Sequence, residues 1–167
     1  MLLELARRTA IEGSPVGIEL LFTVSEERAL AGAKAFDVQA LRSPFGFVFD
    51  HASPIGEIVV ASPTYMRWEA AFTGKAAHAG LHPEEGRSAI LAAAKAVAAL
   101  PQGRIDEGTT VNVAQIRGGV AGTNVVPEHC TVVGEARSLS DAALEQVMGE
   151  IVDDLHDAAN DPACSCD

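Results

Sequence analysis

Two hydrophobic periodicities, one of a strand and one of a helix, predict the fold. Both occur in residues 66–100, MRWEAAFTGKAAHAGLHPEEGRSAILAAAKAVAAL. Apolar and polar residues alternate over 66–74, which predicts a half-buried β-strand. Residues 86–100 form an Ala-rich run that predicts a helix, with Ser88 near its start and Pro101 at its stop. We therefore expect a strand followed by a helix, joined by the Gly-bounded segment between them.

The same patterns continue downstream. Residues 109–119 and 128–139 alternate with period two and predict two more strands. Residues 140–160 open with a Ser-Asp cap and then repeat apolar residues at helical spacing. The order strand, helix, strand, strand, helix predicts a ferredoxin-like βαββα(β) domain that lacks its last strand. One sheet edge would then be unpaired, and because such an edge invites pairing with another chain, we expect an oligomer.

Residues 1–63 have a different pattern of apolar residues. Short apolar runs at 17–24, 45–50 and 56–63 predict strands, and the Ala-rich segment 28–37 predicts a helix. This alternation predicts an α/β unit with a parallel or mixed sheet. We therefore expect two domains, a partial catalytic α/β segment at 1–63 and a second domain at 64–167.

The composition excludes several classes of protein. Of the 167 residues, 48% are hydrophobic and 21% are charged, a balance typical of a globular chain. The net charge of −11 has the wrong sign for binding nucleic acid. No run approaches the ~20 apolar residues of a membrane span, and the first residues do not resemble a secretory signal. The expected location is therefore cytoplasmic, without nucleic-acid or membrane partners.

Three carboxylates follow the predicted strands of the first segment. Glu26 and Glu27 come directly after strand 17–24, and Asp50 ends strand 45–50. Ligands of open α/β sheets gather at the carboxyl ends of strands, and zinc accepts carboxylate ligands there. The alternative is that the glutamates favour a helix N-terminus and that the aspartate is a turn residue. The pattern by itself leaves both readings open.

The segment GKAAHAGLHPEEG, residues 74–86, has the density of ligand residues that a metal site would have. His82 precedes a proline and is predicted to lie in a solvated turn. Glu84 and Glu85 precede the predicted helix and suit its N-terminal dipole. We therefore favour a strand end, a turn and a helix start over a metal site in this segment.

Four motifs occur in an order that resembles a known family. They are TVSEERALAGAKAFD (23–37), FVFDH (47–51), GKAAHAGLHPEEGRSAI (74–90) and GGVAGTNVVPEHCTVVGEARSL (118–139). Together they resemble the zinc-dependent exopeptidases and deacylases that include peptidase T, carboxypeptidase G and acetylornithine deacetylase, and most of all the peptidase T-like tripeptidases. The resemblance implies a catalytic α/β domain with two zinc ions and an inserted ferredoxin-like lid that dimerises.

The resemblance also implies roles for the three carboxylates. Glu26 matches the general base that deprotonates the attacking water, Glu27 matches a zinc ligand, and Asp50 matches a ligand of the second zinc. The family's His-x-Asp motif, its bridging aspartate and its last histidine ligand have no match in this sequence. His51 stands where a small residue is more usual. A zinc pair held by this chain alone would therefore be incomplete.

Three lid residues match the family's substrate-binding groups. His78 matches a histidine that reaches into an active site, typically that of the partner subunit, and donates to the oxyanion of the tetrahedral intermediate. Asn124 and Arg137 match residues that hold the substrate, and an arginine suits a terminal carboxylate because it binds both oxygens. The resemblance thus implies a homodimer that cleaves short peptides.

Two alternatives remain at this stage. The chain can be a non-catalytic dimerisation module, which leaves open whether it is itself an enzyme. It can also belong to an N-acyl amino acid amidohydrolase of the same family, because Asn124 and Arg137 would serve either substrate.

Overall fold

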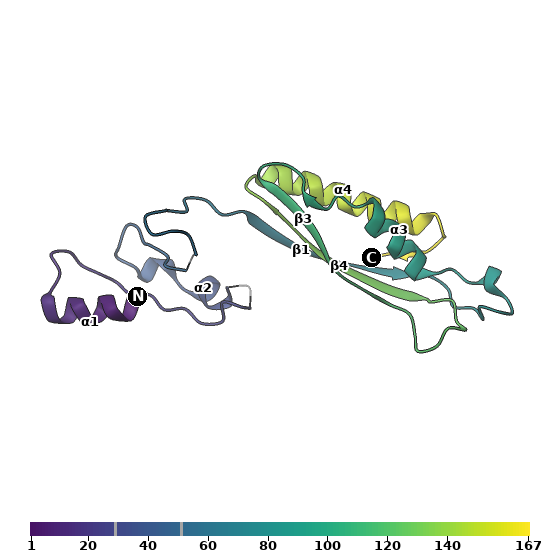
Figure 1. Cartoon of the computed structure of the whole chain (residues 1–167), viewed down its shortest axis with the longest axis horizontal. Helices are drawn as coiled ribbons and strands as arrows, with labels where there is room; N and C mark the ends of the chain where they lie inside the picture. Colours follow the sequence, from purple (N-terminus) through teal and green to yellow (C-terminus); the bar gives the residue numbers. More distant parts are fainter. Residues whose placement is uncertain (29, 51) are drawn as a thin grey trace. The chain divides into compact units, whose positions relative to one another are not determined.

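The computed structural model describes residues 1–28, 30–50 and 52–167 (Figure 1). The chain divides into two units, Met1–Glu57 and Ile58–Asp167, which are described separately below. His51 lies outside the described residues. The domain boundary expected after residue 63 falls a short way inside the second unit.

The second unit is an antiparallel sheet covered on one face by two helices, α3 and α4 (Figure 1). The strands lie in the order β2-β3-β4-β1-β5. This arrangement confirms the predicted ferredoxin-like fold. The elements are β1 (Thr64–Thr73), α3 (Ala89–Ala99), β2 (Gly103–Arg104), β3 (Thr109–Gly118), β4 (His129–Ser138), α4 (Asp141–Asn160) and β5 (Ser165–Cys166), with a 3₁₀ turn η2 (Pro83–Glu85).

The core lies between the helices and the inner face of the sheet. Every second residue in the second half of β1 is buried, as the alternation predicts. Helix α3 contributes alanines to the core, which allows it to lie close to the sheet, and α4 contributes larger aliphatic residues at helical spacing. The buried apolar residues of the sheet and the two helices are Trp68, Ala70, Phe72, Ala89, Ala92, Ala93, Ala96, Val111, Cys130, Val132, Ala136, Leu144, Val147, Ile151, Leu155 and Ala159.

Serine side chains start both helices of this unit. The Ser88 hydroxyl accepts a hydrogen bond from the Leu91 backbone N–H at 3.1 Å, and Ser140 accepts from the Ala143 N–H at 3.3 Å. Each bond satisfies a backbone donor that the first turn of a helix leaves without a partner. The predicted start of both helices is thus confirmed.

The end of the chain corrects one part of the predicted fold. We expected the last strand of the domain to be missing, yet β5 occupies its place and pairs antiparallel with Phe72 and Thr73 of β1. The pairing continues through Asp167, which exchanges two backbone hydrogen bonds with Ala71, at 2.8 and 3.1 Å. Backbone pairing with an existing edge stabilises this short strand, a contribution that the sequence pattern does not reveal.

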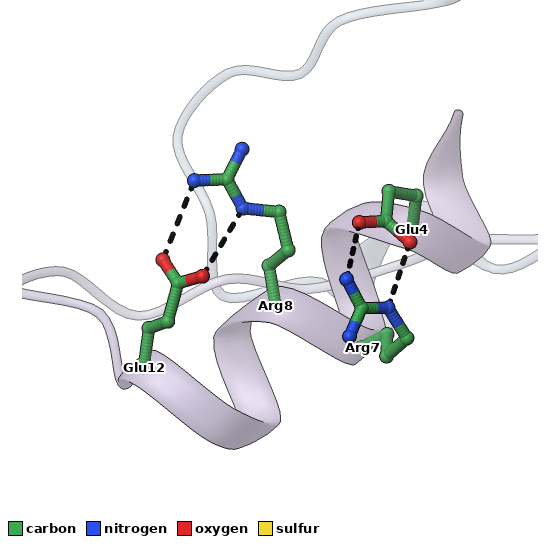
Figure 2. Close-up of polar contacts among 4 residues, drawn as sticks. All are labelled: Glu4, Arg7, Arg8 and Glu12. Atoms are coloured by element: carbon green, nitrogen blue, oxygen red, sulfur yellow. Dashed lines mark hydrogen bonds and ion pairs between the residues drawn. The ribbon is translucent and has the colours of Figure 1, made fainter.

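The first unit contains helices and extended segments. Its elements are α1 (Leu2–Glu12), α2 (Ala31–Ala35) and the 3₁₀ turn η1 (Val38–Ala40). Ion pairs join Glu4 to Arg7 and Arg8 to Glu12 along the surface of α1, as Figure 2 shows. Among the described residues of this unit, no side chain is buried.

The strands predicted at 17–24, 45–50 and 56–63 are wrong for this structure, because no described residue of these ranges belongs to a strand. A strand needs a neighbour for its backbone N–H and C=O groups, and no described segment pairs with these apolar runs. The predicted helix at 28–37 is confirmed only over Ala31–Ala35. None of the described helices is long and apolar enough to cross a membrane.

Candidate functional site

Backbone pairing brings His78 and Asn124 together, although they are distant in the sequence. The Ala79 N–H donates to the Asn124 carbonyl and the Val126 N–H donates to the Ala77 carbonyl, both at 2.9 Å. His78 thereby forms an antiparallel bridge with Val125. Two of the predicted lid residues therefore lie on adjacent extended segments.

Two glycines allow this region to pack closely. A Cβ atom on Gly74 would lie 2.0 Å from the Arg87 carbonyl oxygen, and one on Gly86 would lie 2.8 Å from the Val126 side chain. Lys75 and Arg87, the residues that follow these two glycines, exchange two backbone hydrogen bonds, each of 2.9 Å. The glycines that bound the GKAAHAGLHPEEG segment are therefore needed for close backbone approach.

The His78 side chain has a defined tautomer when neutral. Its Nδ1 accepts a hydrogen bond from the Gly80 backbone N–H at 3.1 Å. A neutral imidazole whose Nδ1 accepts carries its proton on Nε2. His78 therefore presents Nε2–H as a donor, which is the group that oxyanion stabilisation requires.

His82 has no comparable arrangement. It lies at the start of the 3₁₀ turn η2, with its exposed ring 3.5 Å from the Glu84 carboxylate. The predicted solvated turn is confirmed, and an exposed pair of this kind contributes little to stability. Among the described residues, no group of three or more His, Cys, Asp or Glu side chains could hold a metal ion.

Arg137 lies at the opposite end of the sheet. Its Nε donates to Glu135 Oε1 at 2.8 Å, and its guanidinium lies 5.1 Å from the centre of the Tyr65 ring. The hydrogen bond to Glu135 raises the pKa of Arg137 above its ordinary value. The sequence analysis missed both neighbours: Glu135 could have been found from its i, i+2 spacing on the strand, whereas Tyr65 becomes adjacent only through the β1–β4 register.

The length of the sheet separates Arg137 from the other two lid residues. The loops that carry His78 and Asn124 extend beyond the end where β1 stops and β4 starts (Figure 1). From the first residue of β4 to Arg137 the strand covers about 27 Å, at about 3.4 Å per residue. A dipeptide or tripeptide is too short to contact both ends of one sheet.

The three carboxylates of the first unit are exposed. Glu26 and Glu27 lie in a turn that follows Ser25, whose φ of 59° is left-handed, and the Leu30 N–H donates to the Glu26 carbonyl at 2.9 Å. Asp50 lies in a segment without regular secondary structure. The structure does not gather these three side chains into a metal-binding group.

The described residues do not by themselves provide enough ligands for a catalytic zinc ion. A catalytic zinc site takes three protein ligands and keeps a fourth position for water or substrate. Glu27 and Asp50 provide two carboxylates, and the part of the chain that the structure describes adds no third ligand beside them. The chemistry of the donors suits zinc, but their number does not.

Comparison with known proteins identifies the fold's family. The model of the peptidase dimerisation domain of the M20 class matches residues 60–161. The chain belongs to this family. The family resemblance drawn from the sequence motifs is therefore confirmed, and the matched range contains His78, Asn124 and Arg137.

Solved structures of this family extend the similarity to nearly the whole chain. Aminopeptidase PepT from Bacillus cereus superposes with a TM-score of 0.86 at 40% identity, over 96% of this chain and 43% of its own. A tripeptidase from Staphylococcus aureus gives a TM-score of 0.92 at 34% identity, over 99% of this chain and 44% of its own.

A further relative comes from a bacterial hydrolase. It is one of the subunits of the p-aminobenzoyl-glutamate hydrolase of Escherichia coli, and it is 34% identical over 85% of this chain and 34% of its own length. The chain thus spans 34–44% of the length of these three relatives.

Proposed function

We propose that this chain belongs to a homodimeric peptide hydrolase that cleaves short peptides, in the manner of an aminopeptidase or tripeptidase. The observation that carries the proposal is the similarity to a tripeptidase over 99% of the chain, which includes the first unit although none of the described residues of that unit is buried. A cytoplasmic location belongs to the same proposal.

The three lid residues would bind different parts of the substrate. His78 would donate its Nε2–H to the oxyanion that forms as the peptide carbonyl is attacked, a role supported by the acceptor position of its Nδ1. Asn124, on the adjacent segment, would donate to the same region of the substrate. Arg137 would bind a carboxylate through its two Nη groups, because its Nε already donates to Glu135.

Two copies of the chain would be needed to bring these groups to one substrate. His78 and Asn124 lie beyond one end of the sheet and Arg137 lies at the other, about 27 Å along β4. A site that uses all three residues would take Arg137 from one protomer and His78 with Asn124 from its partner. The dimerisation-domain family supports this arrangement.

Glu26 is proposed as the general base that accepts a proton from the attacking water, and Glu27 and Asp50 as two zinc ligands. Zinc would supply Lewis-acid activation of the water when it is bound. A complete zinc site would need ligands in addition to these two carboxylates. The roles proposed for His78, Asn124 and Arg137 do not depend on how that site is completed.

An N-acyl amino acid amidohydrolase is the second candidate. It is favoured by the similarity to the p-aminobenzoyl-glutamate hydrolase polypeptide over 85% of the chain. Both substrate classes carry a carboxylate on the amine side of the bond to be cleaved, so Arg137 would serve either one. A third possibility is that this chain acts only as a dimerisation module.

A hydrolysis assay with added zinc or cobalt separates these possibilities. In an enzyme whose further ligands complete the zinc site, we expect turnover of a tripeptide that disappears in Glu26→Gln and persists in the matched variant Glu12→Gln, which changes an exposed carboxylate of α1. Faster turnover of p-aminobenzoyl-glutamate than of the tripeptide would favour the amidohydrolase. No turnover of either substrate at any metal concentration in such an enzyme would contradict both hydrolase proposals.

A further inference from the structure

Within the second unit, helices α3 and α4 cover one face of the sheet and leave the opposite face open (Figure 1). Successive side chains of a strand point to opposite faces, so the residues between the buried ones of β1 and β4 lie on this open face. They include Arg67 and Glu69 of β1, and Glu135 and Arg137 of β4. The open face therefore carries charged side chains where the covered face carries the apolar core.

A hollow of about 270 Å³ lies on this open face. Three neighbouring strands line it, with the residues Arg67, Glu69, Gln115, Arg117, Thr131 and Val133. Val133, near the middle of β4, is half-buried and is the only apolar residue of this lining. Pockets that hold a whole drug-sized ligand measure about 300–1,000 Å³. The hollow therefore suits a molecule of only a few heavy atoms.

The lining contains a cation without an acidic partner. On the same face, Arg67 pairs with Glu69 and Arg137 pairs with Glu135, in each case at 2.8 Å. Arg117 forms no ion pair with any carboxylate that the structure describes. A guanidinium group can bind both oxygens of a carboxylate. Arg117 is thus available to a carboxylate supplied by a ligand.

The lining also contains a carboxylate with an oxygen to spare. The Arg67 guanidinium donates to Glu69 Oε2 at 2.8 Å, and no donor among the described residues bonds to Glu69 Oε1. Glu69 is in register with Val133, whereas Arg117 is in register with Thr131, two residues along β4. The free cation and the free carboxylate oxygen therefore come from strands on opposite sides of β4.

These two charges select the kind of ligand that fits. A simple anion would pair with Arg117, but the negative charge of Glu69 in the same hollow would repel it. A simple cation would be repelled by Arg117 in the same way. A small zwitterion satisfies both groups, and the Gln115 amide and the Thr131 hydroxyl can donate or accept further hydrogen bonds.

We propose that the hollow binds a free α-amino acid, with its carboxylate on Arg117 and its ammonium group on Glu69. Both charged groups of an α-amino acid are attached to one carbon atom, which suits a hollow of this size. Val133 would contact the side chain, so we expect a small apolar residue such as alanine. In the proposed peptidase, such a molecule is a product of the reaction. The binding itself does not depend on that function.

The first test is isothermal titration calorimetry of the full chain in metal-free buffer. The probes are L-alanine, N-acetyl-L-alanine and L-alaninamide, and each analogue lacks one of the two charges. We expect L-alanine to bind about tenfold or more tightly than either analogue. Equal binding of L-alanine and an analogue, or no binding of L-alanine, overturns the proposal.

Variants of the two charged residues test where the amino acid binds. Arg117→Gln and Glu69→Gln should each weaken the binding of L-alanine by about tenfold or more. The matched controls are Arg104→Gln on β2 and Glu145→Gln on α4, which change exposed residues outside the hollow. They should leave the dissociation constant within about twofold. Equal losses in the control variants would overturn the assignment to the hollow.

A final measurement uses the unaltered chain, so it does not depend on whether a variant folds. In two-dimensional amide NMR spectra, L-alanine should shift the signals of residues 115–117 and 131–133. Shifts confined to residues 77–79 and 124–126 would place the amino acid at the proposed substrate site instead. That result would overturn the proposal for the hollow while leaving the proposed peptidase function intact.

Discussion

Residues 1–57 and residues 58–167 both carry large apolar side chains, but only the second region buries them. Phe22, Phe47 and Phe49 are each more than half exposed in the first region, whereas Trp68 and Phe72 are almost completely covered in the second. The second region contains its own pairing partners, because β1, β3 and β4 form one sheet and two helices cover it. An apolar run therefore becomes a buried strand only where the same chain offers it a neighbour.

The largest expected difference between the regions concerns a buried aromatic ring. Phe72→Ala should lower the free energy of unfolding by about 3–5 kcal/mol, because it leaves a cavity in the core. Phe47→Ala, at a side chain that is 68% exposed, should change it by less than about 0.5 kcal/mol. Urea unfolding followed by circular dichroism measures both, and similar losses in the two variants would mean that the first region has a core as well.

Two glycine variants compare a tightly packed position of the second region with an open one. A Cβ atom on Gly134 would lie 2.2 Å from the Trp68 ring and 2.6 Å from the Asn112 carbonyl oxygen. Gly134→Ala should therefore cost about 1–3 kcal/mol through overpacking.

Gly149 of α4 is the control for this substitution, because nothing lies within 4 Å of its added Cβ. Gly149→Ala should stabilise the helix by about 0.5–1 kcal/mol. Thermal unfolding of the two variants should therefore shift in opposite directions. A loss of stability in both would show that the space around Trp68 does not decide the effect.

The smallest expected difference comes from one hydroxyl group in each region. Ser140 and Ser14 each accept a backbone hydrogen bond of 3.3 Å, from Ala143 and Val16 respectively. Ser140→Ala should cost about 1 kcal/mol because it removes the N-cap of a helix that covers the core. Ser14→Ala should leave the unfolding midpoint unchanged. An equal shift of the midpoint in both variants would contradict the conclusion that the interactions that stabilise the fold lie in residues 58–167.

The periodicity of the second region made its elements predictable almost to the residue. The strand expected at 109–119 is observed at Thr109–Gly118, and the helix expected at 140–160 is observed at Asp141–Asn160. In the first region the same reasoning failed at 17–24 and 45–50, because hydrophobicity predicts burial without specifying the partner.

The candidate site was predictable as a set of residues, but not as an arrangement. His78, Asn124 and Arg137 were selected from motifs in the sequence, and the family to which they point is confirmed. Their positions depend on strand register, which pairs the His78 segment with residues 124–126 and leaves Arg137 at the far end of β4. Register involves contacts between segments far apart in the chain, and no local pattern encodes that separation.

By itself, the sequence determined the order of the three long strands and two helices after residue 64, the helix caps and the motifs of the M20 family, because each depends on local spacing in the sequence. The tertiary structure decided which predicted strands could form, that β5 completes one edge, and which charged side chains share the open face of the sheet. It also decided that the substrate-binding candidates occupy opposite ends of one sheet. These features depend on which backbone edges and side chains meet in space, and such contacts exist only once the chain has folded.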